Sequence, residues 1–373
     1  MTTLRPHRFA SRARFALAGI LVGLRVGAAE VTVNWNDNST DEAGFEIECS
    51  RDGNSFTRIA TVGANVTSFV DTAAPDNAAW YRVRAFNARF QSDYSNVTGF
   101  SSGASSLTSA SSSRLTNLSA RATPGEGDQS LIVGFVVENG PMSVLVRGIG
   151  PGLSSYTSVP TFRDPQLSVR QGSVLVAEND NWAGADPLKA AFARVGAFAL
   201  SDASKDAAVL TTFAPQGYNA SIAGSGIGLA MAEIYDVDPA TQAHGRLVNL
   251  SVRAQTAPGD GLLIVGFVIA GGSPLRVLIR AAGPGLRALG VTTALADPRL
   301  ELFRGAVKWN ANDNWGGTGE LIAAFQTAGA ALWAGPSKDA AIVSVLPPGA
   351  YTALVSGVDG SSGAALAEVY ELP

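Results

Sequence analysis

Short runs in which apolar and polar residues alternate make up most of the chain after residue 30. Residues 31–35 (Val-Thr-Val-Asn-Trp), 45–49 (Phe-Glu-Ile-Glu-Cys) and 80–86 (Trp-Tyr-Arg-Val-Arg-Ala-Phe) each place every second side chain on one face. This alternation predicts β-strands that are buried on one face, and turn-forming residues separate the runs. We therefore expect residues 30–100 to form a sandwich of antiparallel strands.

The rest of the chain contains one sequence written twice, at 114–238 and 246–373. The segments RLTNLS (114–119), LIVGFV (131–136), NDNW (179–182) and SKDAA (204–208) return as RLVNLS (246–251), LIVGFV (263–268), NDNW (312–315) and SKDAA (337–341). A repeat this long indicates a duplicated domain rather than a solenoid of short repeats. A residue that is present in one copy only cannot be required by the fold that both copies share.

The strand pattern is clearest in the second copy. We predict strands near 247–254, 261–269, 275–281, 299–304, 306–310, 338–346, 350–357 and 364–371, and a short amphipathic helix over 319–328. Because residues 263–269 are all apolar apart from Gly266, we expect that strand to be buried on both faces. Gly283-Pro284-Gly285, like Gly150-Pro151-Gly152, is typical of a tight turn. The chain is therefore expected to be all-β, with two β-sandwich or jelly-roll domains that each contain at most one short helix.

Three segments in residues 30–100 resemble the fibronectin type III family. They are Trp35 with the turn Asn36-Asp37-Asn38-Ser39, the pattern Tyr81-x-Val83-x-Ala85-x-Asn87, and 92–96 (Ser-Asp-Tyr-Ser-Asn). The resemblance implies a sandwich with a strand before the tryptophan strand, but that strand is not evident: it is missing, is supplied by another segment, or the signal is cut elsewhere. A missing strand would expose a sheet edge, which invites pairing with another chain. The repeats resemble tandem modules of exported bacterial proteins, and their NDNW and PGAYT (348–352) segments resemble the small sandwich domains that trail secreted peptidases.

The N-terminus has the pattern of a secretory signal over residues 1–29. Four arginines precede an apolar run of ten residues at 15–24, and small residues follow at 27–29. Ten residues are too few to span a bilayer, which takes about 20. We expect an exported protein located outside the cell, at its surface or in the periplasm. Residues 101–113 are Ser-rich and predict a flexible linker, and 239–245 predict a short connection between the copies.

Charge and composition exclude some classes of function. The formal net charge of −4 falls to −9 when the five arginines of residues 1–29 are removed, so no basic face for nucleic acid is expected. Cys49 is the only cysteine, and its place in an alternating strand predicts a buried thiol rather than a nucleophile. His244 is the only histidine after the signal, and its position between the copies disfavours a catalytic triad or a zinc site.

Paired carboxylates are the remaining route to catalysis, as in glycosidases. Both copies contain the pairs Asp128/Asp260, Asp164/Asp297, Asp206/Asp339 and Glu233/Glu368. Each pair also has a structural interpretation, such as turn initiation at Asp-Pro or a local ion pair between Lys205 and Asp206. Two identical active sites side by side would be unusual, so we expect no enzymatic activity.

The Asn-Asp-Asn-Trp turns are the candidate metal sites. Asn310, Asn312 and Asn314 place oxygen ligands at alternate positions, as calcium loops do. The complete set of candidate ligands is Asn179, Asp180, Asn181, Asn310, Asn312, Asp313 and Asn314. Because carboxylates are few, the favoured interpretation is a hydrogen-bonded turn with a tryptophan packed beneath it, and no cofactor.

Aromatic side chains could bind a sugar. Trp309 and Trp333 occur only in the second copy, so they are the candidates for a surface platform. The predicted function is a non-catalytic exported spacer, adhesion or binding module whose partner is a polysaccharide or a cell-surface protein. The alternatives are a carbohydrate-binding accessory protein and, less favoured, a glycoside hydrolase that uses paired carboxylates.

Overall fold

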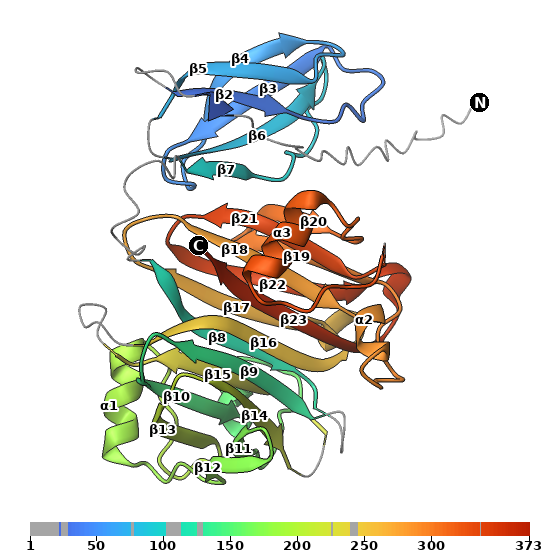
Figure 1. Cartoon of the computed structure of the whole chain (residues 1–373). Coiled ribbons are helices and arrows are strands. Elements are labelled where there is room, and N and C mark those ends of the chain that lie inside the picture. Colours follow the sequence, from blue (N-terminus) through green and yellow to red (C-terminus); the bar gives the residue numbers. More distant parts are fainter. Residues whose placement is uncertain are drawn as a thin grey trace. The chain divides into compact units, whose positions relative to one another are not determined.

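A computed structural model describes residues 22–23, 29–75, 78–101, 113–124, 130–224, 227–238, 245–335 and 337–373 (Figure 1). The chain divides into two compact units, residues 1–107 and 108–373, which we call unit 1 and unit 2. Most of the predicted signal, residues 102–112 of the predicted linker, Asp128 and His244 lie outside the described residues. Within the described part, no helix has the length and apolarity that a membrane crossing needs.

Unit 1 is a sandwich of two antiparallel sheets, as expected. One sheet has the order β1 (Val22–Gly23), β2 (Ala29–Asn34), β5 (Ser68–Ala74), and the other has the order β4 (Thr57–Gly63), β3 (Gly44–Ser50), β6 (Ala78–Phe86), β7 (Thr98–Ser101). The alternating residues Phe45 and Ile47 of β3 and Tyr81 and Val83 of β6 fill the core with Trp35. The period-two pattern therefore identifies which face of each strand is buried.

A short strand occupies the position where the sequence showed none. Residues Val22 and Gly23 of β1 pair with Val31 and Glu30 of β2. These two residues belong to the segment predicted to be the signal. The edge of β2 is therefore paired, over two residues, by the chain's own N-terminal segment.

Unit 2 contains both copies of the repeat. The first copy contributes β8 (Arg114–Ala122), β9 (Leu131–Glu138), β10 (Met142–Ile149), β11 (Gln166–Gln171), β12 (Val174–Asn179), α1 (Asp186–Val195), β13 (Ala207–Phe213), β14 (Gly217–Ala223) and β15 (Ala230–Asp236). The second contributes β16 (Arg246–Thr256), β17 (Leu263–Ala270), β18 (Leu275–Ala282), α2 (Pro284–Arg287), β19 (Pro298–Arg304), β20 (Val307–Asn312), α3 (Gly319–Thr327), β21 (Ala340–Leu346), β22 (Gly349–Gly357) and β23 (Gly363–Leu372). All eight strands and the helix predicted in the second copy are present.

The two copies exchange their first strands. Strand β8 pairs with β15 of its own copy and with β17 of the other, whereas β16 pairs with β23 of its own copy and with β9 of the other. Two long sheets result, β13-β10-β15-β8-β17-β22-β19-β20 and β21-β18-β23-β16-β9-β14-β11-β12, and each passes through both copies. They meet at a single pair, Leu115 and Leu247. The repeat predicted a separate sandwich for each copy, but the strand pairing makes unit 2 one continuous double layer.

A glycine that both copies carry lies where the strands are exchanged. Gly134 of β9 faces Ser251 of β16, and Gly266 of β17 faces Ser119 of β8. A Cβ atom at these glycines would lie 2.5 Å and 2.6 Å from the Oγ atoms of Ser251 and Ser119. The glycine of each LIVGFV segment therefore leaves room for a side chain of the opposite copy.

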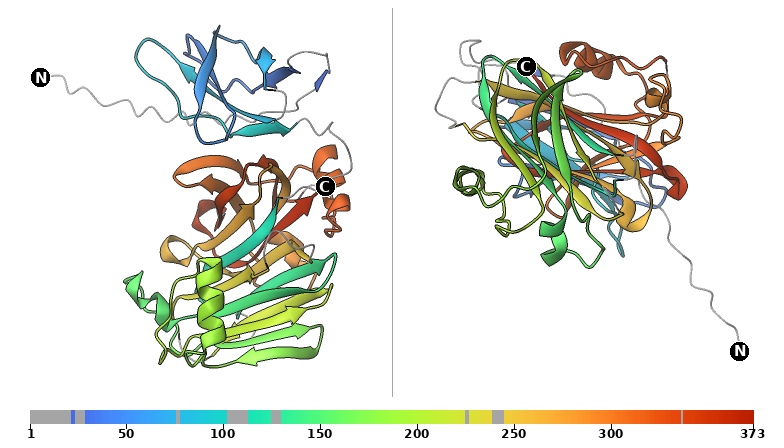
Figure 2. Two further views of the ribbon diagram at one scale, coloured as in Figure 1. Left: turned by 90° about the vertical axis from the view of Figure 1, so that its left-hand side faces the viewer. Right: turned by 90° about the horizontal axis from the view of Figure 1, so that it is seen from below.

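Helices α1 and α3 each cover the outer face of one long sheet. Phe192 of α1 packs with Leu145 of β10, and Phe325 of α3 packs with Leu278 of β18. Figure 2 shows these two helices, green and orange, on opposite sides of unit 2. The reciprocal pairing of strands and the opposed helices relate the copies by an approximate two-fold arrangement.

Two local predictions are wrong. The Gly-Pro-Gly segments begin short helices, a 3-10 helix η2 (Pro151–Ser155) and α2, because proline presets the first helical φ angle. The second copy therefore has two helices rather than at most one. Strand β17 is also not buried on both faces: Leu263, Val265, Phe267 and Ile269 are buried, whereas the residues between them are half-buried.

Candidate binding site

A groove lies between the two edge strands of unit 1, β4 and β5. In the described part of the chain each of these strands pairs on one side only, β4 with β3 and β5 with β2. The groove has a volume of about 780 Å³ and is open to solvent. Its lining comes from β3, β4, β5 and the turn after β3 and comprises Cys49, Arg51, Asp52, Ser55, Thr57, Ile59, Phe69, Val70, Asp71, Thr72, Ala73 and Pro75.

The walls of the groove are apolar in the middle. Ile59 of β4 and Val70 of β5 are 41% and 47% exposed, and Phe69 of β5 is half-buried against the core. Large apolar side chains are exposed singly on most proteins, but here two flank the same groove. The free backbone groups of an edge strand can pair with an added strand, while the side chains beside it select what is added.

One end of the groove is polar and charged. Asp52 accepts hydrogen bonds from the backbone N–H groups of Asn54 and Ser55 at 2.8 and 2.9 Å and from the Ser50 hydroxyl at 2.8 Å. The bonds from Ser55 and Asn54 lower the pKa of the Asp52 carboxyl, so it is ionised at neutral pH. Arg51 beside it supplies the opposite charge.

The floor of the groove has no reactive nucleophile. The Tyr81 hydroxyl donates to Asp71 at 2.8 Å in a buried hydrogen bond, and Asp71 also accepts from the Ala73 N–H at 3.0 Å. Burial raises the pKa of the Cys49 thiol to about 11, so the thiol stays protonated at neutral pH. Because the thiolate is the reactive form, Cys49 acts as a small, half-buried apolar group.

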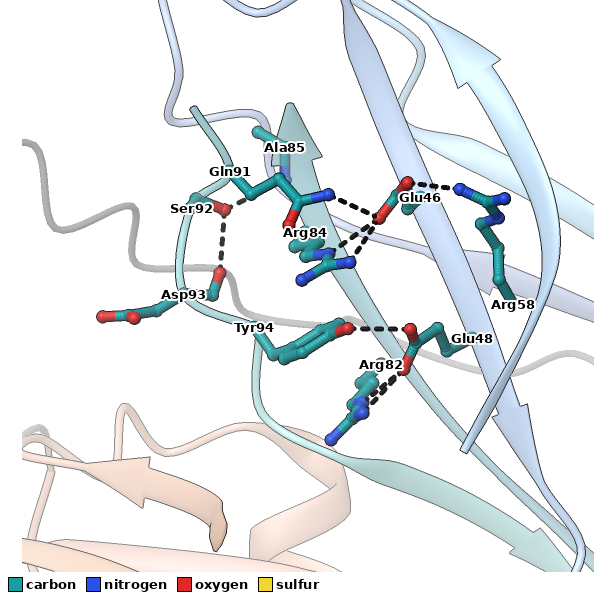
Figure 3. Close-up of polar contacts among 10 residues, drawn as sticks. All are labelled: Glu46, Glu48, Arg58, Arg82, Arg84, Ala85, Gln91, Ser92, Asp93 and Tyr94. Atoms are coloured by element: carbon teal, nitrogen blue, oxygen red, sulfur yellow. Dashed lines mark hydrogen bonds and ion pairs between the residues drawn. The ribbon is translucent and has the colours of Figure 1, made fainter. Parts of the chain in front are cut away.

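The outer face of the β4-β3-β6 sheet carries a network of ion pairs (Figure 3). Glu46 of β3 contacts Arg58 of β4 at 2.6 Å and Arg84 of β6 at 2.7 Å, and Glu48 contacts Arg82 at 2.6 Å. Burial opposes ionisation of Glu46, but the hydrogen bonds from the two arginines outweigh it and lower the pKa of this carboxyl. These are cross-strand pairs of opposite charge, which stabilise a sheet.

The aromatic ring of Tyr94 packs against the arginines of this network. The ring of Tyr94 lies 3.8 Å from the Arg82 guanidinium and 4.6 Å from that of Arg84, and its hydroxyl donates to Glu48 at 2.7 Å. The side chain of Arg82 is only 17% exposed, whereas Arg58 is 60% exposed. The network is therefore internally satisfied, and Arg58 is the group at its rim that solvent reaches.

Unit 2 contains a buried cluster of charged side chains beneath α1 and another beneath α3. In the first copy Arg147 of β10 lies 3.1 Å from Glu233 of β15, which accepts a hydrogen bond from the Tyr235 hydroxyl at 2.7 Å. The rings of Phe192 and Phe198 lie 4.4 and 4.6 Å from the guanidinium. Burial raises the pKa of Glu233, and Arg147 opposes that rise.

The second copy repeats the cluster. Arg280 contacts Glu368 at 2.9 Å, Tyr370 donates to Glu368 at 2.6 Å, and the rings of Phe325 and Trp333 each lie 4.5 Å from the guanidinium. The two glutamates were among the predicted carboxylate pairs, but the arginines were not predicted as site residues. The signal was present, because an arginine recurs 133 residues apart inside an apolar strand. Helices α1 and α3 cover these clusters, and the contacts between the arginines and the aromatic rings attach each helix to its sheet.

The other paired carboxylates also have structural partners. Asp206 is fully buried and accepts from the N–H groups of Gly150 and Gly152, and Asp339 does the same for Gly283 and Gly285. The ion pairs expected within Lys205-Asp206 and Lys338-Asp339 are absent: each lysine pairs with the aspartate 41 residues earlier, Asp164 or Asp297. Asp260 lies in the short helix η3 (Gly259–Gly261).

Each Asn-Asp-Asn-Trp turn follows an edge strand, β12 or β20, and is hydrogen-bonded to the strand β13 or β21. Asn179 accepts from the Ala208 N–H and donates to the Asn181 carbonyl, and Asn312 does the same with Ala341 and Asn314. Trp182 and Trp315 are buried beneath the turns. Of the other candidate ligands, Asp180 is exposed, Asn310 accepts from the Ala311 N–H at 2.8 Å, and Asp313 accepts from Asn314 at 3.3 Å. Calcium binding stays a prediction, and the first asparagine of each turn is engaged by the backbone.

The two tryptophans proposed as a surface platform do not form one. Trp309 is fully buried and packs edge-on against Tyr351 at 6.0 Å. Trp333 is half-buried against Trp315 and Phe325. The expectation of exposure was wrong for Trp309 because its side chain on β20 points into the core. The equivalent residue of the first copy, Val176 on β12, is 42% exposed.

Comparison with solved structures finds likenesses to part of the chain. One is to the solution structure of the sixth fibronectin type III domain from human fibronectin type III domain containing protein 3, at 22% identity. The match covers 25% of this chain and 90% of that domain, with a TM-score of 0.20. No family model matches the chain, and no curated protein matches it. The description of unit 1 as a two-sheet sandwich rests on its own strand pairing.

Proposed function

We propose that the chain is a non-catalytic, exported binding module. The observation that carries this proposal is the groove between β4 and β5, with Ile59 and Val70 on its walls and a free strand edge on each side. An extended peptide segment fits this geometry, because either edge can supply backbone hydrogen bonds and the walls accept apolar side chains. Unit 1 is the fibronectin type III-like part of this proposal.

In this proposal unit 2 serves as a spacer. Each of its two long sheets runs through both copies, so the strand pairing continues from one copy into the other. The charged clusters that the described residues contain there are buried or paired, which supports a structural rather than a catalytic role. Export is inferred from the N-terminal basic and apolar pattern alone.

Selection with displayed peptides tests the binding proposal. A library of random peptides is selected on the whole chain, and the affinity of enriched peptides is measured for the parent and for a double variant, Ile59→Lys with Val70→Lys. Two charged side chains on the apolar walls of the groove should raise the dissociation constant at least about tenfold, or 1.4 kcal/mol. The matched control is Leu289→Lys, an apolar residue that is 77% exposed in unit 2.

Two results would contradict the proposal. Peptides that bind the double variant as well as the parent would place binding elsewhere, and a library that yields no groove-dependent peptide would remove its basis. A glycan array run in parallel addresses the carbohydrate alternative. Glycan retention that survives the double variant would favour that alternative over the groove.

Export is tested separately. Production of the full chain in a secreting bacterial host should give a mature protein whose first residue is Glu30. Retention of residues 1–29 on the protein in the cytoplasm would refute export while leaving the binding proposal open to its own experiment.

A further inference from the structure

The outer end of the first copy has an edge strand that lacks the protection found in the second. Strand β12 ends one long sheet and β20 ends the other, and in the described chain each pairs on one side only, with β11 and β19. Figure 1 shows β12 at the lower edge of unit 2. Free edges of this kind are usually guarded by charged side chains, because they otherwise pair with further strands.

Both edge strands carry a β-bulge, at Val176 of β12 and at Trp309 of β20, but only β20 is also guarded by a charged side chain. Lys308 of β20 pairs with Glu301 of β19 at 2.6 Å, and the next residue, Trp309, turns into the core. The equivalent residues of the first copy, 133 positions earlier, are Leu175, Ser168 and Val176. The charged pair is thus replaced by a leucine and a serine.

The unguarded strand exposes apolar side chains on both of its faces. Val174, Leu175 and Val176 are 61%, 42% and 42% exposed. The second copy forms the same hairpin with a lysine in place of the leucine, so the shared fold does not require these exposed apolar groups. A role outside the monomer explains why they are there.

We propose that β12 pairs antiparallel with β12 of a second copy of this chain, which joins two molecules into one continuous sheet. A two-fold axis at Leu175 would place the two leucines opposite each other and each Val174 opposite Val176. Glu178 would then face Gly172 rather than another carboxylate. From Gln171 to Ala177 the strand and its turn carry no charge, so this strand can meet its own copy without repulsion.

The choice of a second copy over another protein rests on this self-complementarity. An isologous contact requires the same surface on both partners, and an uncharged strand whose sequence is apolar around its centre meets that requirement. The interface is one short strand, well below the area of a standard stable complex, so the expected dissociation constant is about 10–100 µM.

Sedimentation velocity of the whole chain, from about 1 to 300 µM, tests the pairing. The parent should shift from monomer to dimer over this range. Leu175→Lys, which restores the residue of the guarded copy, should raise the dissociation constant at least tenfold. Leu289→Lys, which removes an exposed leucine away from any strand edge, should leave it unchanged.

Cross-linking of single cysteines gives a second readout. With Cys49→Ala as background, Leu175→Cys should form a disulfide-linked dimer under mild oxidation, and Lys308→Cys, at the equivalent place on β20, should not. A chain that stays monomeric at the highest concentration, or a dimer that Leu175→Lys leaves intact, would overturn the proposal. Equal cross-linking at both positions would show random collision and would overturn it as well.

Discussion

The buried ion pair between Arg147 and Glu233 offers a quantitative test of how unit 2 holds its helices. The change is Arg147→Met, which keeps an apolar chain of similar length and removes the charge. Neither partner is more than 5% exposed, and their nearest N and O atoms are 3.1 Å apart. At an effective dielectric constant of about 20, that distance corresponds to a gross attraction of about 5 kcal/mol.

Desolvation of the two ions offsets most of that attraction, so the pair contributes little net stability. Its disruption is different, because Glu233 would remain buried with only the Tyr235 hydroxyl as a partner. Removal of one member of a buried pair costs about 3–5 kcal/mol. The variant also loses the hydrogen bond from Arg147 to the Phe198 carbonyl at 3.0 Å.

Chemical denaturation monitored by tryptophan fluorescence measures the loss. The double variant Arg147→Met with Glu233→Gln removes both charges and keeps an acceptor for Tyr235, so it should recover most of the lost stability. Lys189→Met removes an exposed lysine that pairs with Asp202, and it should have no resolvable effect.

The loss should depend on pH with a definite sign. The pKa of Glu233 is already raised by burial, and removal of Arg147 raises it further. A carboxyl whose pKa is higher in the folded than in the unfolded state favours folding below the unfolded pKa, and this contribution disappears as the pH rises through the folded value. The cost of Arg147→Met should therefore be smaller in acid than at neutral pH. A cost that is below 1 kcal/mol, or that grows on acidification, would refute the reasoning.

Three further predictions concern unit 2. Trp309→Ala should lower the free energy of unfolding by about 3–5 kcal/mol because the ring is fully buried against Tyr351, whereas a surface tryptophan would give almost no change in the same denaturation experiment. Asp339→Asn should cost about 2–4 kcal/mol, since its carboxylate accepts hydrogen bonds from Gly283 and Gly285, and hydrogen exchange at those two amides should rise; unchanged protection would contradict this. Calorimetric titration of the whole chain with calcium should give no heat of binding at the Asn-Asp-Asn-Trp turns; saturable binding at millimolar metal would restore the calcium hypothesis.

The strand exchange gives the duplication a physical consequence. Consecutive strands β8 and β9 do not pair with each other; each completes the sheet of the opposite copy instead. Gly134 and Gly266, which lie in these exchanged pairs, are identical in the two copies for the same steric reason. One copy by itself would therefore leave two strand edges unpaired in the middle of the sandwich.

Local patterns in the sequence determined the elements of this protein. The alternation in β3 and β6 and the amphipathic segment of α3 each reflect which side chains meet water and which do not. That property belongs to a few neighbouring residues, so it can be read without knowledge of the partner strands. The duplication was equally visible, and it showed which residues the fold does not require.

Only the tertiary structure decided which strands pair and what the pairing leaves open. β8 and β16 begin with nearly the same side chains, RLTNLS and RLVNLS, so either strand satisfies the hydrophobic pattern of either position. The choice depends on the energy of the whole double layer, in which contacts distant in sequence add together. For the same reason the burial of Trp309, the groove between β4 and β5 and the unguarded edge of β12 could not be predicted: each arises from the relation between strands that no local pattern encodes.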